Sequence, residues 1–148
     1  METDSAALFS DLIRLETELW NVVAARLLSE HGLELTWFEP MQVIAREPDC
    51  RVHDVVEALS ITVGGASKLV DRIEAAGFCR RRENPADRRS SFIDLTPKGK
   101  QLLAAASRTF AREVELRLRI PLSPRRFQEF ARTILHLRSE LQVRQVQK

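Results

Sequence analysis

Apolar residues near the start of the chain recur at spacings of three and four positions, the pattern of an amphipathic helix. The series extends from Ser5 to about Ser29. Its members are Leu8, Leu12, Leu15, Leu19, Val22, Val23 and Leu27. Such a pattern places the apolar side chains on one face, so we predict a long first helix.

A second, shorter helix is predicted after residue 35. Thr36 followed three positions later by Glu39 has the form of a capping box, in which each side chain bonds the other residue's backbone N–H. Met41, Val43 and Ile44 would face the core, and Pro48 is expected to end the helix.

Two more helices are expected between residues 52 and 77. Val52, Val55, Val56 and Leu59 mark a third helix. Thr62 can cap a fourth, whose apolar positions lead to a glycine suited to follow a helix end. These positions are Ala66, Leu69, Val70, Ile73 and Gly77. About three residues separate the two helices, which is typical of a helix-turn-helix.

A β-hairpin is predicted after Gly77. The runs Phe78 to Glu83 and Ser91 to Leu95 are too short for helices, and the Asn-Pro-x-Asp sequence at residues 84–87 favours a turn between them.

Two further helices complete the expected fold. Thr96 and Pro97 suit the cap and first position of a fifth helix, which should end by Pro121. Ser123 and Pro124 similarly open a sixth. Its apolar residues form a heptad-like seam of Phe127, Phe130, Ile134, Leu137 and Leu141.

Composition and charge narrow the functional classes. With 148 residues and 44% apolar content, one compact chain is expected. No run of about 18 apolar residues suggests a membrane span, and the acidic N-terminus is unlike a signal peptide, so we predict a cytoplasmic protein. Net charge is only +2, but residues 1–47 carry −6 and residues 68–100 carry +4. Such a local basic segment is typical of nucleic-acid binding.

The third helix, the fourth helix and the hairpin follow one another in the order of a winged helix-turn-helix. The second helix of such a pair, here the fourth helix, enters the DNA major groove. If Ala66, Leu69, Ile73 and Ala76 face the core, small, polar and cationic residues remain outside. These are Thr62, Gly64, Gly65, Ser67, Lys68, Asp71 and Arg72. The two glycines either allow close approach of the helix start to a phosphate or base edge, or mark a frayed helix start.

The hairpin, or wing, carries five arginines. Arg88 and Arg89 at its tip are expected to reach the minor groove. Arg80, Arg81 and Arg82 lie on one strand, so their side chains alternate between faces; we assign Arg82 to a DNA phosphate. A solvated hairpin balanced by nearby acids is the alternative.

At this point the chain resembles the MarR (multiple-antibiotic-resistance regulator) family of bacterial transcriptional regulators. The matching segments are LVDRIE at residues 69–74 with Gly77, NPADRRS at residues 84–90, and LTPKG at residues 95–99. The resemblance implies a mainly α (α+β) winged helix-turn-helix with a dimer region. It assigns residues 1–35 to an N-terminal dimerisation helix, 36–96 to the DNA-binding domain, and 97–148 to C-terminal dimerisation helices.

The resemblance also implies specific roles. The homodimer would read a pseudo-palindromic operator in double-stranded DNA, most simply as a repressor. Asp71 would pair with Arg89 and so orient the wing. A small aromatic or anionic effector would bind near Trp20, Trp37 and Met41, although these side chains can equally belong to the core. Larger polar residues are more usual in the family at positions 64 and 65.

Other functional classes have weaker support in the sequence. The scattered His31, His53 and His136 do not suggest a metal site, and Cys50 and Cys79 form no CxxC pair. No catalytic motif or cofactor signature is evident, so we predict a non-enzyme without a cofactor. The alternative function is a dimeric helical protein whose basic hairpin binds an acidic partner without sequence-specific DNA recognition.

Overall fold

The computed structural model describes residues 4–146, with side chains through residue 143. It begins with α1 (Ser5–His31), confirming the long first helix. The Asp4 carboxylate accepts a hydrogen bond from the Ala6 N–H at 3.2 Å. Gly32, at φ 63°, ends the helix in the left-handed conformation that a glycine adopts at low cost.

Helix α2 (Leu35–Arg46) begins two residues earlier than predicted, and the Thr36–Glu39 capping box is wrong. Glu34 occupies the cap position, and the Thr36 hydroxyl donates to its carboxylate at 3.3 Å. Leu35 is buried, so packing of this side chain favours including it in the helix. Helix α2 supplies much of the core, including the fully buried Phe38 and Met41.

Helices α3 (Val52–Leu59) and α4 (Val63–Ala75) form the predicted pair. The chain turns between them at Ser60, whose φ is 53°. Helix α4 is followed by Gly77 at φ 81°, as predicted. Both helices pack on α2, and α4 also contacts the first strand.

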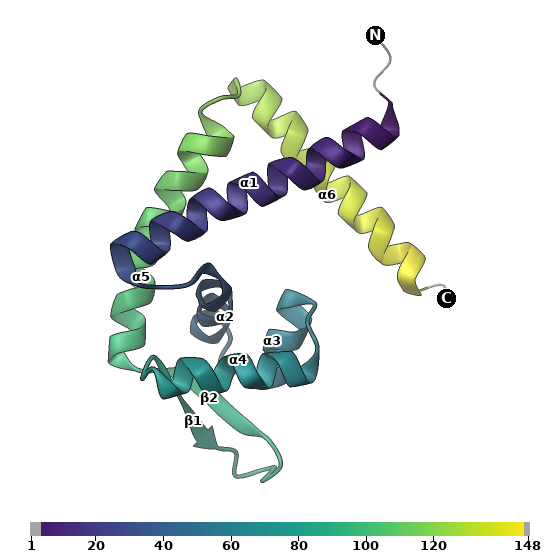
Figure 1. The fold of residues 1–148 in the computed structure, drawn as a ribbon. Coiled ribbons are helices and arrows are strands. Elements are labelled where there is room, and N and C mark those ends of the chain that lie inside the picture. The colour runs from purple at the N-terminus through teal and green to yellow at the C-terminus, as the bar shows by residue number, and fades with distance from the viewer. Residues whose placement is uncertain (1–3, 147–148) are drawn as a thin grey trace. The chain divides into compact units, whose positions relative to one another are not determined.

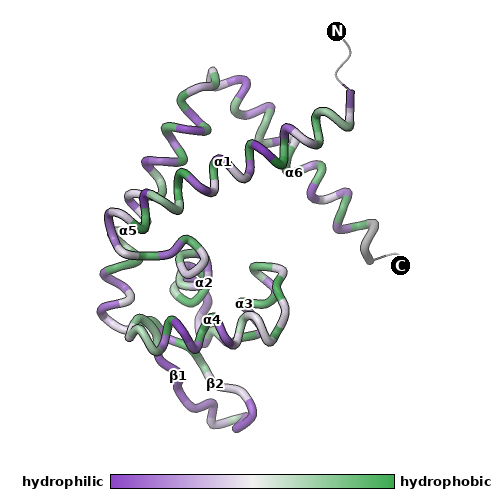
Figure 2. The backbone as a smooth tube through the Cα atoms, in the orientation of Figure 1, coloured by the Kyte–Doolittle hydropathy of each residue, from purple (hydrophilic) through white to green (hydrophobic). Residues whose placement is uncertain are grey.

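The hairpin consists of antiparallel β1 (Cys79–Glu83) and β2 (Ser91–Leu95), in register from Cys79 opposite Leu95 to Glu83 opposite Ser91. This matches the prediction. The hairpin extends from the end of α4 (Figure 1). Figure 2 shows that β1 is almost wholly hydrophilic, whereas β2 includes apolar residues. Ile93 and Leu95 of β2 are buried and anchor the hairpin in the core.

Helix α5 (Pro97–Val114) starts where predicted. The Thr96 hydroxyl accepts from the Gly99 N–H at 3.0 Å and donates to the Gly77 carbonyl at 2.7 Å. One side chain therefore joins the start of α5 to the end of α4. A π-helical segment, η1 (Glu115–Arg119), continues from α5.

Helix α6 (Pro124–Val146) begins at the predicted Ser123-Pro124 signal. One compact chain was expected, but the structure groups into two compact units that divide between Phe110 and Ala111. The first contains α1 to β2 and most of α5, and the second contains η1 and α6. None of the helices in the described part of the chain has the length and apolar character needed to cross a membrane.

Candidate nucleic-acid interface

The start of α4 is well ordered by a side-chain cap. The Thr62 hydroxyl accepts from the Gly65 N–H at 3.1 Å, and the Ala66 N–H donates to the Thr62 carbonyl at 2.9 Å. The first turn of α4 is therefore formed and capped from Thr62 onward. Gly64 and Gly65 are exposed, so their backbone lies open to an approaching partner.

The outer face of α4 is close to the predicted one. Thr62, Lys68 and Arg72 are exposed, whereas Ser67 is half-buried. The inner face differs slightly, because Val70 is fully buried together with Ala66 and Ile73. The predicted core residues Leu69 and Ala76 are only half-buried.

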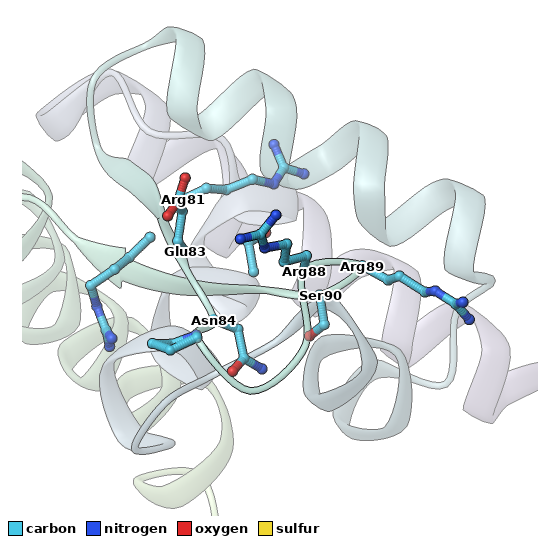
Figure 3. Close-up of a pocket in the computed structure, with 9 residues that line it drawn as sticks. Arg81, Glu83, Asn84, Arg88, Arg89 and Ser90 are labelled. Atoms are coloured by element: carbon cyan, nitrogen blue, oxygen red, sulfur yellow. The ribbon is translucent and has the colours of Figure 1, made fainter.

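Polar and basic side chains line a pocket along the wing (Figure 3). It includes Arg81 and Arg82 of β1 and Arg88 and Arg89 of the tip. Arg88 and Arg89 extend away from each other from neighbouring positions (Figure 3). The tip backbone is ordered by Asn84, whose side-chain oxygen accepts from the Ala86 N–H at 3.0 Å. Both arginines that follow this bend are exposed.

A second pocket, the α3 pocket, joins the wing to the helix-turn-helix. Its lining includes Arg51 and His53 from the start of α3, Ser67 of α4, and Arg89 of the wing. Three elements therefore present hydroxyl groups and cations to one surface. Sequence reasoning missed Arg51 and His53. Their basic side chains at a helix start, where free N–H groups also favour anions, were the available signal.

The structure corrects the predicted partner of Asp71. The Asp71 carboxylate pairs with Arg81, not with Arg89. Arg81 also lies 3.6 Å from a Glu74 oxygen. Strand β1 packs against α4, which brings Arg81 beside both acids, whereas Arg89 lies beyond the strands at the tip.

Arg82 also differs from its predicted role as a phosphate contact. Its guanidinium donates to Asp94 at 3.0 Å and to Asp49 at 2.9 Å, and lies 4.8 Å from the centre of the Phe92 ring. Hydrogen bonding from Arg82 lowers the pKa of the Asp94 carboxyl below its usual value. Two carboxylates therefore balance this cation, which makes it a poor candidate for binding a phosphate.

The predicted effector residues do not come together in one pocket. Met41 is fully buried in the core, and Trp37 packs edge to face against Phe78 with ring centres 6.5 Å apart. Trp20 instead lines a shallow groove between α1 and the start of α2, with Leu28 and Glu34. Only Trp20 of the three is placed to contact a ligand there.

The comparisons with known proteins agree with this architecture. The model of the MarR family matches residues 31–90, which contain the helix-turn-helix and most of the wing. The helix-turn-helix and the adjoining part of the wing are thus similar to those of the MarR family. The transcriptional regulator HosA of Escherichia coli O111:H- is 36% identical over 66 residues, and these cover 45% of this chain and 49% of HosA. MhqR of Bacillus subtilis is 28% identical and is aligned over 51% of this chain and 52% of its own length.

Solved MarR structures extend the likeness to nearly the whole fold. A regulator from Streptomyces coelicolor in complex with DNA has a TM-score of 0.86 at 20% identity, and covers 95% of this chain and 93% of its own. The MepR–DNA complex of S. aureus has a TM-score of 0.80, also at 20% identity, and covers 94% and 99%. The chain spans about half the length of the curated relatives it matches. The winged-helix fold is thus confirmed across regions where sequence identity is low.

Proposed function

We propose that this protein is a transcriptional regulator of the MarR family that binds a pseudo-palindromic operator in double-stranded DNA as a homodimer. The observation that carries the proposal is the α3 pocket, where Ser67 of α4, the start of α3 and Arg89 of the wing line one surface. Helix α4 would enter the major groove, and the wing tip would reach the adjacent minor groove. Such a regulator, most simply a bacterial repressor, would act in the cytoplasm.

Each part of this surface has a role in the proposal. Thr62, Gly64 and Gly65 bring the helix start to a phosphate or base edge. The Gly65 N–H is bonded to the Thr62 hydroxyl, so the N–H of Gly64 is the one offered to an anion. Ser67, Lys68 and Arg72 face the major groove. Arg88 contacts the minor groove from the wing tip. Arg89 lies between the tip and the α3 pocket, where a phosphate would meet Arg51.

Dimerisation is supported by exposed apolar side chains on two helices. Leu8, Phe9, Leu12, Ile13 and Leu15 of α1 are all at least 37% exposed. In the α6 seam, Leu137 and Leu141 are exposed, whereas Phe127, Phe130 and Ile134 are half-buried. Large exposed apolar faces mark interaction surfaces. Sedimentation at micromolar concentration should therefore give twice the chain mass, and a folded monomer would contradict this assembly.

A small-molecule effector would fit best in the groove lined by Trp20. The indole ring and Leu28 offer an apolar surface, but Glu34 in the same lining repels an anion. We therefore propose a neutral or cationic aromatic compound that releases the protein from DNA. Titration monitored by tryptophan fluorescence, compared with Trp20→Phe, would test this assignment.

Salt dependence tests the DNA-binding proposal directly. Binding of a duplex should weaken steeply with salt, with a log-log slope near −0.9 per phosphate neutralised. Two chains should bind each operator. Binding to an acidic protein in preference to every duplex would support the alternative interaction protein instead.

A further inference from the structure

Two neighbouring arginines of β1 form ion pairs on opposite faces of the hairpin. Arg81 turns toward α4, where it meets Asp71 and Glu74. Arg82 turns the other way, toward Asp94 of β2 and Asp49 of the α2–α3 turn. Because side chains alternate along a strand, two consecutive arginines can hold both faces of one hairpin.

Hydrogen bonds from backbone N–H groups hold both strands at the same position along the hairpin. The Arg81 N–H donates to the Glu74 carboxylate at 2.7 Å, and the Ile93 N–H donates to the Cys50 carbonyl at 2.7 Å. Arg81 and Ile93 are partners in the strand register, so both outer edges of the two-stranded sheet are bonded at one cross-section. An isolated two-stranded hairpin is marginally stable. These two bonds take the place of hydrogen bonds that a further strand would form with the hairpin.

The arginines of the tip differ from those at this cross-section. Within the described side chains, the guanidinium groups of Arg88 and Arg89 form no ion pair, and both residues are exposed. The Arg89 backbone N–H donates to the Asp87 carboxylate at 3.0 Å. The tip charges therefore remain available to a polyanion, whereas those of Arg81 and Arg82 are balanced by acids.

We propose that Arg81 and Arg82 are positioning residues that fix the wing, and that Arg81 takes the place beside Asp71 so that Arg89 is free to contact DNA. The part concerning DNA rests on the proposed function. The part concerning the wing does not, because it follows from contacts within the free protein.

Asp71 is an acid on α4, the helix that is proposed to approach DNA, and its pairing with Arg81 accounts for its presence there. Asp71 contacts no phosphate in this arrangement but holds the cation that joins α4 to the wing. Removing its charge should weaken DNA binding even though the interface becomes less negative. The loss should depend on Arg81 and not on Arg89.

Hydrogen exchange in the free protein tests the positioning role. Arg81→Gln and Arg82→Gln should each raise exchange of the β1 and β2 amides, by about tenfold, because local opening becomes easier. Arg46→Gln is the matched control: it removes the same charge from an exposed pair, with Glu47 at 3.0 Å, outside the wing. Unchanged wing exchange in both Arg81→Gln and Arg82→Gln would overturn the proposal, whether or not the protein binds DNA.

DNA titration across a salt series separates positioning from direct phosphate binding. Arg81→Gln should lower affinity several-fold with an unchanged salt slope, whereas Arg89→Gln should make the slope shallower by about 0.9 for each phosphate that Arg89 neutralises. In the Arg81→Gln protein, adding Asp71→Asn should cause little further loss of DNA affinity. In the Arg89→Gln protein, the same substitution should lower affinity as much as it does in the wild-type protein. A shallower salt slope in Arg81→Gln would overturn the assignment. So would affinity losses that are non-additive between Asp71 and Arg89 but additive between Asp71 and Arg81. If the wild-type protein binds no duplex, the proposed function fails. The hydrogen-exchange result still shows whether Arg81 and Arg82 fix the wing.

Discussion

Replacing Gly64 by alanine should separate folding stability from DNA binding. Gly64 lies in the first turn of α4 without a positive φ, and a Cβ built there meets no atom within 4 Å. Alanine therefore gains helix propensity without a clash, by about 0.5–1 kcal/mol. For a chain of this size, that gain raises Tm by about 1–4 °C.

The same methyl group should weaken DNA binding. It would stand on the exposed surface where α4 is proposed to approach the duplex, beside free N–H groups of the helix start. Loss of one hydrogen bond from such a group to a phosphate costs about 1.5–3 kcal/mol. Affinity should then fall by about tenfold or more for each half-site.

Gly65→Ala is the internal comparison. Its Cβ would lie 3.1 Å from the Thr62 Oγ1, so the capping hydroxyl must move. Because a cap contributes about 1 kcal/mol, the gain in stability should be smaller than for Gly64→Ala. Thermal unfolding by circular dichroism and duplex titration by fluorescence anisotropy measure the two effects. A Gly64→Ala protein with a raised Tm and unchanged DNA affinity would refute the close approach of the helix start.

Four other predictions concern the wing, helix α4, the start of α5 and the buried thiols. Arg88→Ala should reduce the salt slope by about one phosphate equivalent and lower affinity more for A·T-rich flanks than for G·C-rich ones. Lys68→Ala should instead change preference at one operator position or weaken all sequences equally, and matched duplex titrations distinguish these results. Gly99→Ala should destabilise the fold by about 3 kcal/mol or more in denaturant unfolding, since its Cβ would lie 1.9 Å from a backbone oxygen. Burial raises the pKa of Cys50 to about 12 and that of Cys79 to about 11, so both should react slowly with iodoacetamide at pH 8 until the protein unfolds.

Local signals explain why much of the fold was predictable from sequence. Thr62 and Thr96 each cap a helix through a backbone N–H three residues later, an interaction that depends on neighbouring residues alone. The hairpin was likewise marked by its turn sequence and by Gly77. The start of α2 was misjudged because burial of Leu35 is a tertiary effect that outweighs a local capping pattern.

The errors at the candidate site concern partners distant in sequence. The choice between Arg81 and Arg89 for Asp71 depends on how β1 lies against α4, and the spacing of charges along the chain does not specify this. Arg82 is held by Asp49, 33 residues earlier in the chain. Trp20, Trp37 and Met41 are similar in chemical character, but one lines a groove, one packs on Phe78 and one is core.

Selection of bound sequences from a pool of random duplexes tests the central claim most directly. Two exposed α4 helices related by the two-fold axis of a dimer should enrich paired, inverted half-sites, with centres about 10–10.5 base pairs or a multiple of that distance apart. Enrichment should decrease as salt rises and should be lost with Arg88→Ala and Gly64→Ala together. Recovery of a pool no different from the starting one, at every salt concentration at which the protein remains folded, would contradict the account.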